Sequence, residues 1–447
     1  MRLTFGTDGV RGLANTELTP EIALALGRAA ARVLGGSAFV VGRDTRVSGP
    51  LLQAALSAGL ASEGADVVDL GVVPTPTIAW AAAERGVPGA VVSASHNPFA
   101  DNGVKLFAAG GTKLDNDVER RVEDELVATL AGGSHAAPTA ERVGRISADP
   151  GAGERYAKAV MASLEGRDLS GLRVVLDCAH GAASHLAPRI FADLGAELSC
   201  VGTDPDGTNI NDGVGSTHPE AVRAAVAAAG AQVGLALDGD ADRVLAVDDA
   251  GGLVDGDHLM AMCATDLRSR GLLAGDTVVV TVMTNLGFRL AMRQAGIRVH
   301  ETPVGDRNVL MALEQHGWVL GGEQSGHIIF RHLATTGDGI LTGVQLLDLV
   351  RRSGRRLADL AAEAMTRMPQ ELRSVRVADP GGLNDADEVW MEVSEVERQL
   401  HGRGRVVLRP SGTEPVVRVM VEADDAGAAR AAVDRLCGVV EEALGRP

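Results

Sequence analysis

An acidic loop at residues 238–243, with the sequence Asp-Gly-Asp-Ala-Asp-Arg, predicts a metal site. Asp238, Asp240 and Asp242 stand at alternate positions after an apolar run, so their carboxylates can converge on one cation. Hard cations such as Mg²⁺ prefer oxygen ligands and leave coordination positions for phosphate oxygens. A solvated acidic turn is the alternative, but three repelling carboxylates without a cation are unfavourable. We therefore favour a metal site, with Arg243 beside it as an anchor for an anionic substrate.

A candidate nucleophile follows the apolar run at residues 89–92, which is typical of a buried strand. The run breaks into small polar residues that include Ser95 and His96, and then into an Asn-Pro turn signal. Strand ends in α/β sheets are where ligands and chemistry usually lie, so Ser95 is well placed to attack a substrate. For this segment taken alone, an ordinary strand-to-loop turn is the alternative.

A glycine-rich polar loop at residues 321–327 has side chains suited to a polyhydroxyl ligand. Glu323 and Ser325 alternate, so on an extended segment they face the same side and could bind sugar hydroxyls. His327 could be a general acid or base, because the unperturbed pKa of histidine lies near neutrality. A structural turn with a surface histidine is the alternative.

A fourth loop has the chemistry of a phosphate cradle. Its members are Arg409, Ser411, Gly412, Thr413 and, on the following strand, Arg418. Guanidinium groups fork onto phosphate oxygens, hydroxyls donate, and a glycine lets backbone amides approach. The chain has neither a GxxxxGK[ST] loop nor a convincing dinucleotide fingerprint. The four loops together indicate an enzyme that acts on a phosphorylated sugar.

Alternating helices and strands must position these loops. The first part of the chain predicts helices at residues 20–34, 50–63, 77–85 and 116–130, strands at 38–41, 67–70 and 89–92, and a hairpin turn at 101–105 with Lys105 on the returning strand. This alternation indicates a largely parallel sheet covered on both faces. Similar strand-turn-helix patterns begin near residues 38, 172 and 277 and indicate a weak internal repeat.

We expect four domains. They are an α/β domain at 1–150 with the serine loop, an α/β domain at 151–252 with the metal loop, an α/β domain at 253–367 with the sugar loop, and an α+β domain at 368–447 with the phosphate loop. The last has expected strands at 375–377, 390–393, 405–408 and 416–421 and a closing helix at 426–444. The predicted fold is α/β, with three similar mixed-sheet domains and a smaller C-terminal α+β lid around a central cleft.

Composition excludes several classes of function. The 447 residues carry a formal net charge of −17, which argues against nucleic acid or an anionic membrane as a partner. Aromatic residues make up only 2%, so base-stacking platforms are not expected. The four cysteines are far apart, and no signal-peptide pattern or membrane-length apolar run occurs. We expect a cytoplasmic protein, monomeric or homodimeric.

The four loops are similar, in order and across essentially the whole chain, to the signature loops of the α-D-phosphohexomutase superfamily. The opening loop at residues 5–12 and Gln324 resemble the bacterial branch that acts on glucosamine phosphates, whereas relatives that act on glucose or mannose phosphates tend to carry Met in place of Gln324. The resemblance implies interconversion of glucosamine 6-phosphate and glucosamine 1-phosphate, on the route to UDP-N-acetylglucosamine and peptidoglycan. It also implies one Mg²⁺ per chain and a hexose 1,6-bisphosphate as intermediate and activator.

The resemblance also implies a role for each site residue. It makes Ser95, chosen over Ser93 by the motif match, a phosphoserine and a metal ligand with the three aspartates. By their matched positions, Arg11 and Lys105 would polarise or deprotonate the attacking hydroxyl. The sugar would be surrounded by His96, Arg243, Glu323, Ser325 and His327, and the phosphate that does not react would be held by Arg409, Ser411, Gly412, Thr413 and Arg418. A mobile fourth domain would then exclude water from the reaction.

Three other functions compete with this reading. The nearest is a mutase of the same chemistry for glucose or mannose phosphates, because Gln324 alone does not decide between an amine and a hydroxyl at C2. A Mg²⁺-dependent sugar phosphatase would use the same groups but transfer the phosphoryl group to water. A non-catalytic phosphosugar-binding protein would not need both Ser95 and the aspartates.

Overall fold

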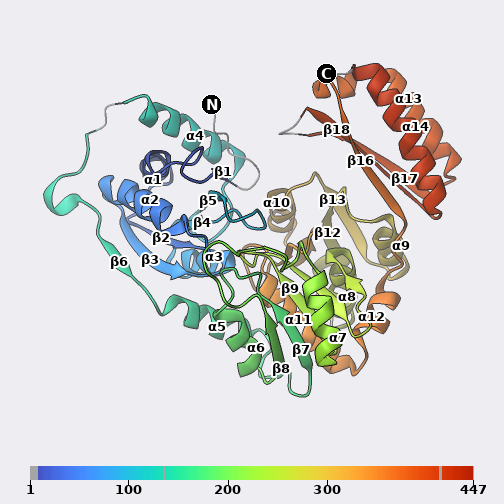
Figure 1. The fold of residues 1–447 in the computed structure, drawn as a ribbon, viewed down its shortest axis with the longest axis horizontal. Helices are drawn as coiled ribbons and strands as arrows, with labels where there is room; N and C mark the ends of the chain where they lie inside the picture. Colours follow the sequence, from blue (N-terminus) through green and yellow to red (C-terminus); the bar gives the residue numbers. More distant parts are fainter. Residues whose placement is uncertain (1–8, 134–135, 412–414, 446–447) are drawn as a thin grey trace.

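Four sheets, each with helices packed beside it, make up the fold (Figure 1). The computed structural model describes residues 9–133, 136–411 and 415–445. The first three sheets are mixed, and the C-terminal sheet is antiparallel. The predicted α/β class with a smaller C-terminal α+β unit is therefore confirmed. The domain boundaries and the central cleft stay predictions.

The first sheet has the order β1-β5-β4-β2-β3-β6 and is covered on both faces. Its strands are β1 (Val10–Leu13), β2 (Ala38–Arg43), β3 (Asp66–Val72), β4 (Gly89–Val92), β5 (Asp101–Phe107) and β6 (Ile146–Ala148). Its helices are α1 (Pro20–Leu34), α2 (Gly49–Ser62), α3 (Thr75–Arg85) and α4 (Asn116–Leu130). Side chains alternate along β2, so Phe39 and Val41 join the core with α1 and α2, while Val40 packs with Ile78 of α3.

Residues 101–105 correct one expectation: they begin β5 and are not a hairpin turn. Gly103 pairs with Arg11 of β1, and Lys105 pairs with Val91 of β4, so this segment is hydrogen-bonded in a ladder on both sides. Two flanking strands override the turn preference of its Asp-Asn-Gly sequence. Lys105 lies on a strand, as expected, and the actual turn is the serine loop itself at residues 93–100.

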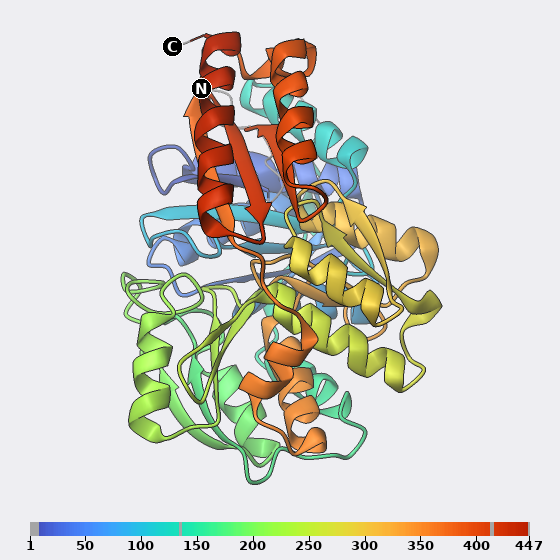
Figure 2. The ribbon, with the colours of Figure 1, turned by 90° about the vertical axis from the view of Figure 1, so that its right-hand side faces the viewer.

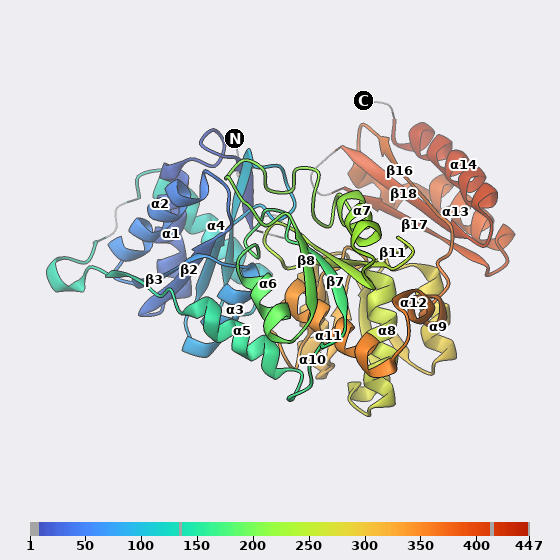
Figure 3. The ribbon, with the colours of Figure 1, turned by 60° about the horizontal axis from the view of Figure 1, so that its bottom comes forward.

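The second and third sheets follow the first in the chain, with orders β11-β10-β9-β7-β8 and β13-β12-β14-β15. The second contains β7 (Arg173–Asp177), β8 (Glu197–Val201), β9 (Val233–Leu237), β10 (Val244–Asp248) and β11 (Leu253–Val254), with α5 (Ala152–Ala162), α6 (Leu186–Asp193) and α7 (Glu220–Ala229). The third contains β12 (Thr277–Thr281), β13 (Arg298–Thr302), β14 (Leu320–Gly322) and β15 (Ile328–Phe330), with α8 (Gly256–Ser269), α9 (Leu286–Gln294), α10 (Asp306–His316), α11 (Gly339–Ser353) and α12 (Leu357–Ala364). Figure 3 shows α6 and α7 on opposite sides of the second sheet.

The three mixed sheets share one four-strand order. In each, a central strand (β2, β7 or β12) has parallel neighbours on both sides, and an antiparallel strand (β5, β10 or β15) follows one of them. This common order supports the repeat that the sequence indicated near residues 38, 172 and 277. It also makes the serine, metal and sugar loops equivalent connections in the three sheets.

The C-terminal unit is an antiparallel sheet with two helices, set apart at the upper right of Figure 1. It consists of β16 (Gln370–Arg376), α13 (Asp387–Gln399), β17 (Gly404–Pro410), β18 (Val416–Ala423) and α14 (Ala426–Leu444). The strand predicted at residues 390–393 is wrong, because this stretch lies inside α13. Val389, Val393 and Val396 recur at helical spacing and are buried, whereas Met391 is 73% exposed.

The second and third sheets share one apolar core, in which Leu235 of β9, Val278 of β12 and Leu346 of α11 belong to the same cluster. The C-terminal unit has its own cluster and is reached through the linker at residues 365–369, which runs from α12 to β16 (Figure 2). Across the described ranges, none of the helices combines the length and the hydropathy that spanning a bilayer requires.

Candidate active site

Three equivalent connections carry most of the candidate site residues. Residues 93–100 join β4 to β5, residues 238–243 join β9 to β10, and residues 323–327 join β14 to β15. Each connection leaves the carboxyl end of a parallel strand, the edge at which α/β sheets bind ligands. The amide of Val244 donates to the carbonyl of Gly326 over 3.1 Å, which ties the second connection to the third.

Ser95 is buried, and its backbone is held by side chains of its own loop and of two other segments. Its φ of 51° lies in the left-handed region, which costs a residue with a side chain about 1–3 kcal/mol and is common at functional sites. Its amide donates to Ser93 Oγ over 3.0 Å, and its carbonyl accepts from Arg46 Nη2 and Asn211 Nδ2 over 3.0 and 2.9 Å. A Cβ on Gly239 would lie 2.6 Å from the same carbonyl, so the metal loop needs glycine there to approach the serine loop.

Arg46 is the support of this loop that we expect to matter most for stability. It is 1% exposed, pairs with Asp44 Oδ2 at 2.9 Å, and donates to several backbone carbonyls of residues 95–101. We predict that Arg46→Met lowers the free energy of unfolding by about 3–5 kcal/mol, because it leaves the Asp44 carboxylate buried without its cation. Urea unfolding would show this as a lower midpoint. Arg356→Met, which removes an exposed ion pair with Asp359, should leave the midpoint unchanged, and an equal shift in both variants would contradict the prediction.

The three aspartates converge as expected. All are buried, and carboxylate oxygens of the three lie within 4.8 Å of one another. Lys105 Nζ donates to Asp240 Oδ2 and Asp242 Oδ2 over 2.9 and 3.0 Å, and Thr75 Oγ1 donates to Asp240 Oδ2 over 2.7 Å. Asp240 Oδ1 and Asp242 Oδ1 are buried and have no hydrogen-bond partner among the described residues. Buried carboxylate oxygens without donors fit a hard divalent cation, so this cluster could hold a metal ion.

Ser95 and the first aspartate are in direct contact. Ser95 Oγ donates to Asp238 Oδ2 over 2.6 Å, and the Arg243 amide donates to Asp238 Oδ1 over 3.1 Å. Burial, followed by the charges of Asp242 and Asp240, raises the pKa of Asp238 to about 8. Without a cation the cluster therefore resists holding three full negative charges. The three carboxylates could hold a metal ion next to the serine oxygen.

His327 lies at the opposite side of the cluster, buried between two carboxylates. Its Nδ1 is 3.6 Å from Asp242 Oδ1, and its Nε2 is 3.3 Å from Asp306 Oδ2. Burial opposes a charged ring, but the two carboxylates raise the pKa of His327. Burial likewise opposes the charge of Asp242, but Lys105 and His327 hold its pKa well below the usual value. The Gly337 amide donates to His327 Nε2 over 3.2 Å, so this nitrogen is an acceptor and the ring proton lies on Nδ1, toward Asp242.

His96 is held as a neutral ring. Its Nδ1 lies 3.3 Å from Arg243 Nη1, and because a guanidinium only donates, Nδ1 must be an acceptor. Burial, followed by the charges of Arg243 and Arg11, lowers the pKa of His96 to about 4. The same Nδ1 is 3.3 Å from Ser95 Oγ, whereas Asp238 Oδ2 is at 2.6 Å. The carboxylate is therefore the closer acceptor for the serine proton.

The sugar loop presents an acid and a hydroxyl. Glu323 Oε1 accepts from the Gly305 amide over 3.1 Å. Ser325 Oγ is buried and has no hydrogen-bond partner within the described ranges, so it is available to a ligand. The side chain of Gln324, in contrast, turns back to Asp255 at 3.4 Å and reaches the start of α8. In this structure the Gln324 side chain therefore contacts another part of the protein, the N-cap residue of α8.

The remaining basic residues come from both ends of the chain. Arg11, on β1, donates to Asn97 Oδ1 over 3.4 Å. Arg409 of β17 pairs in register with Arg418 of β18. Burial, followed by Arg418, lowers the pKa of Arg409, and Glu323 of the sugar loop acts in the opposite direction. Ser411 follows β17, while Gly412 and Thr413, like residues 5–8 of the opening loop, lie outside the residues that the structure describes.

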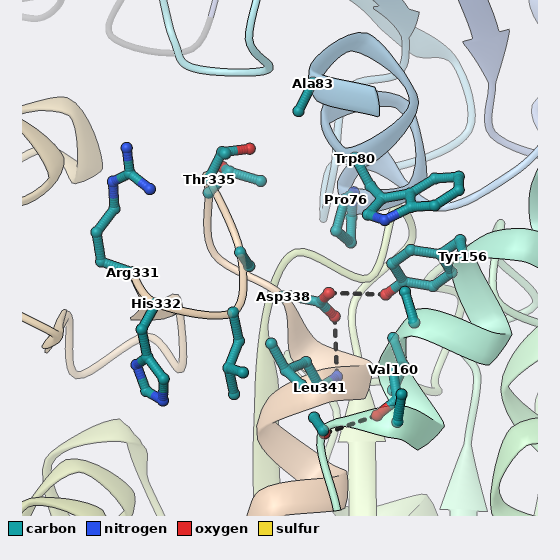
Figure 4. Close-up of a pocket in the computed structure, with 16 residues that line it drawn as sticks. Pro76, Trp80, Ala83, Tyr156, Val160, Arg331, His332, Thr335, Asp338 and Leu341 are labelled. Carbon is teal, nitrogen blue, oxygen red and sulfur yellow. Dashed lines mark hydrogen bonds between the residues drawn. The ribbon is translucent and has the colours of Figure 1, made fainter. Parts of the chain in front are cut away.

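A pocket of about 470 Å³ lies between α3, α5 and the start of α11 and contains none of these site residues (Figure 4). Tyr156 donates to Asp338 Oδ2 over 2.7 Å, and Asp338 Oδ1 accepts from the Leu341 amide over 2.9 Å (Figure 4). Burial raises the pKa of Asp338 to about 6. The amide of Gly339, next in the chain, donates to the carbonyl of Ala241 over 3.0 Å. The start of α11 is therefore hydrogen-bonded to the metal loop.

Several supporting residues were not found by sequence reasoning. Asp44 and Arg46 follow β2 in a charged turn, and their spacing of two was the signal that could have been used. Thr75 lies between two prolines, and Asn211 lies in a long polar loop. Neither has a local pattern that indicates a role, because each acts on a loop far away in the chain.

Comparison with known proteins gives a consistent result along the whole chain. The family descriptions for phosphoglucomutase/phosphomannomutase match four successive segments: α/β/α domain I at residues 2–130, α/β/α domain II at 154–252, α/β/α domain III at 255–368 and the C-terminal domain at 372–439. Curated relatives include the phosphoglucosamine mutase of Desulforudis audaxviator, 52% identical, with 99% of this chain and 98% of the relative covered. That of Frankia alni is also 52% identical, with 100% of both chains covered.

Solved structures share the fold. A phosphoglucomutase/phosphomannomutase family protein from Burkholderia thailandensis superposes with a TM-score of 0.83 at 27% identity, covering 99% of this chain and 98% of that one. The N-acetylphosphoglucosamine mutase of Aspergillus fumigatus, solved with GlcNAc-6P and magnesium, has a TM-score of 0.71 at 18% identity, covering 99% and 96%. At that identity the fungal enzyme supports the fold alone.

Proposed function

The chain belongs to the phosphoglucomutase/phosphomannomutase family, and we propose that it interconverts glucosamine 6-phosphate and glucosamine 1-phosphate. The enzyme is an isomerase with phosphoglucosamine mutase activity, which serves UDP-N-acetylglucosamine and peptidoglycan synthesis. Relatives of that name share 51–52% of their residues with this chain over nearly all of both sequences, which favours the amino sugar as substrate. The single observation that carries the mechanism is the 2.6 Å contact between Ser95 Oγ and Asp238.

Ser95 carries the phosphoryl group as a phosphoserine. A sugar hydroxyl attacks the phosphorus, the bond from phosphorus to Ser95 Oγ breaks, and a hexose 1,6-bisphosphate forms. After the bisphosphate reorients, Ser95 Oγ attacks its other phosphate and restores the phosphoserine. The hydroxyl proton leaves in the first transfer and returns to the departing sugar oxygen in the second, so both transfers balance. Added hexose 1,6-bisphosphate activates the enzyme by phosphorylating Ser95.

One Mg²⁺ per chain would be held by Asp238, Asp240, Asp242 and an oxygen of phosphorylated Ser95. A phosphoserine carries a charge of roughly −1.5 to −2, so it would be repelled by these buried carboxylates alone. When bound, the ion supplies charge neutralisation for the phosphoryl group in transit. The two carboxylate oxygens without donors support this ligand set.

The basic residues around the cluster act on the attacking hydroxyl and the sugar. Lys105 contacts two of the aspartates, and with Arg11 it polarises the hydroxyl or takes its proton. Arg243 and His327 stabilise negative charge on the transferring group from the other side.

The sugar and its second phosphate are held by groups on separate units. Glu323, Ser325 and His96 bind the sugar hydroxyls. The phosphate that does not react is held by Arg409, Ser411, Gly412, Thr413 and Arg418. Burial and then Arg418 lower the pKa of Arg409, and a bound phosphate dianion would favour its charged form, as expected of a phosphate site. The C-terminal unit thereby orients the substrate and excludes water, which would otherwise take the phosphoryl group.

The wider setting follows from the same chemistry. The partner is a phosphorylated amino sugar, and neither nucleic acid nor membrane is required. The cysteines Cys178, Cys200, Cys263 and Cys437 are free thiols, as in reducing compartments, so we place the enzyme in the cytoplasm. It works as a monomer or homodimer, since all the site residues named here come from one chain.

A substrate panel tests the proposed reaction. We predict that, with Mg²⁺ and a hexose 1,6-bisphosphate, kcat/KM for glucosamine 6-phosphate exceeds that for glucose 1-phosphate or mannose 1-phosphate by at least about tenfold, about 1.4 kcal/mol of transition-state binding. Each substrate would be assayed in parallel at the same enzyme concentration. Equal or better turnover of the glucose or mannose phosphate would favour the phosphomannomutase/phosphoglucomutase alternative. Net release of inorganic phosphate would favour the phosphatase.

A further inference from the structure

The first turn of α8 lies between the sugar loop and the linker at residues 365–369 that leads to the C-terminal unit. We propose that Asp255, which caps this turn, is a positioning residue that couples the conformation of the sugar loop to that of the linker. The coupling itself is a property of the ligand-free protein. Its consequence for catalysis rests on the proposed function, in which the sugar loop and the C-terminal unit hold the two ends of one substrate.

One carboxylate oxygen is shared by the two segments. Asp255 Oδ2 accepts from Arg367 Nη1 of the linker over 2.8 Å and from Gln324 Nε2 of the sugar loop over 3.4 Å. The other oxygen, Oδ1, is 2.7 Å from His258 Nδ1 and accepts from the His258 amide over 3.2 Å, which fixes the carboxylate on the helix. The side chain of Asp255 is only 7% exposed, so its position is set by these partners.

The sugar loop is pressed against the same turn by its backbone. The amide of Gly256 donates to the carbonyl of Gln324 over 3.0 Å. A Cβ on Gly256 would lie 2.2 Å from the carbonyl oxygen of Glu323, so the two segments approach as closely as a backbone allows. A shift of the loop that carries Glu323 and Ser325 must therefore also displace residues 255 and 256.

The linker is attached to the same turn by a second route. Asp257 Oδ2 accepts from the Asn285 amide over 2.9 Å. Asn285 in turn binds the backbone of Met368 from both sides, with Nδ2 to the carbonyl at 3.0 Å and Oδ1 to the amide at 2.9 Å. Its Nδ2 also donates to Glu422 of the C-terminal sheet over 3.1 Å. Arg367 is thus connected to the first turn of α8 through Asp255. Met368 is connected to the same turn through Asn285, which is bound to Asp257.

This arrangement gives the linker a preferred orientation that depends on the sugar loop. A ligand that shifts Glu323 and Ser325 alters the contact of Gln324 with Asp255, and the same oxygen holds Arg367. A ligand that contacts the sugar loop differently in two positions of the loop favours one of those positions. Through Asp255 it then also favours one orientation of the C-terminal unit. Gln324, whose side chain contacts Asp255, thereby has a role in the coupling.

Hydrogen exchange of the ligand-free protein tests the coupling, because within the described ranges Arg367 makes no hydrogen bond or ion pair with the sugar loop and is connected to it through Asp255. We expect Arg367→Ala to speed exchange in a peptide spanning residues 323–327 by about two- to fivefold, the range that corresponds to a partly exposed ion pair. Asp255→Asn, which retains a capping side chain for α8, should give a similar increase. With substrate, both variants should raise KM by about two- to fivefold with a smaller change in kcat, and Arg367→Lys should recover part of the loss.

A matched control and a double variant complete the test. Arg435→Ala removes an arginine of similar exposure, 43% against 48%, whose partner Glu392 lies within the C-terminal unit, and it should leave exchange in residues 323–327 unchanged. The effects of Asp255→Asn and Arg367→Ala should not add in the double variant, since both break the same contact. Unchanged loop exchange in Arg367→Ala, or full additivity, would overturn the coupling. Normal coupling without mutase activity would instead count against the proposed function.

Discussion

Ser95→Ala is expected to reduce mutase turnover by at least about a thousandfold, because it removes the oxygen that accepts and donates the phosphoryl group. The buried hydroxyl lies 2.6 Å from Asp238, and removing it leaves the other contacts of the loop, including those of Arg46 and Asn211, in place. The variant should therefore remain folded. Mass spectrometry of the peptide that contains residues 93–98 should show a phosphate in the unmodified enzyme and none in the variant.

Ser93→Ala is the matched control for this result. Ser93 Oγ accepts from the Ser95 amide and donates to Asp44 Oδ2 over 2.6 Å, so its role in the structure is to hold the loop. The control should keep the phosphate on Ser95 and most of its activity, with a lower stability of about 1–3 kcal/mol for the two lost hydrogen bonds. A phosphate that stays on Ser93 in Ser95→Ala, with activity intact, would show that the wrong serine was chosen.

Asp240→Asn is expected to lower turnover by about 10²–10³-fold and to abolish stabilisation by Mg²⁺. Asp240 Oδ1 is a buried acceptor without a donor, and its replacement by an amide puts an N–H or a weaker ligand where a cation would bind. In the unmodified enzyme, Mg²⁺ at about a hundred times its Kd should add about 2.7 kcal/mol of stability, and the melting temperature should rise accordingly. Thermal unfolding of both proteins at increasing MgCl₂ concentrations measures this rise in melting temperature.

The control for Asp240→Asn is a buried aspartate outside the cluster. Asp348 is 1% exposed and pairs with Arg167 and Arg352, so Asp348→Asn should destabilise the fold but retain the rise of melting temperature with Mg²⁺. If the melting temperature still rises with Mg²⁺ in Asp240→Asn but not in Asp348→Asn, the metal does not bind at the aspartate cluster.

The site could be predicted from sequence because each loop has local chemistry. Asp238, Asp240 and Asp242 alternate on one turn after an apolar strand, which was enough to predict their convergence, whereas their link to Ser95 was implied by the family resemblance. The equivalence of the three loops was only partly visible, since the repeat depends on strand order and not on similar residues.

What sequence reasoning missed depends on distant contacts. Arg46 reaches the serine loop about fifty residues later in the chain, and Asn211 reaches it from the second α/β unit. The segment at 390–393 was predicted as a strand because Trp and Val favour strands, but the spacing of its buried valines is helical, and packing decided the outcome. Residues 101–105 became a strand through pairing on both sides, which local turn preference does not report.

Transfer of a labelled phosphate from Ser95 tests the central claim most directly. Enzyme phosphorylated on Ser95 with ³²P would be mixed with one equivalent of unlabelled glucosamine 6-phosphate and Mg²⁺, and stopped within a single turnover. We predict that the label leaves the protein, appears first in glucosamine 1,6-bisphosphate and then in glucosamine 1-phosphate. Label that is released as inorganic phosphate, or that stays on the protein while glucosamine 1-phosphate forms, would contradict a phosphoryl-carrying serine.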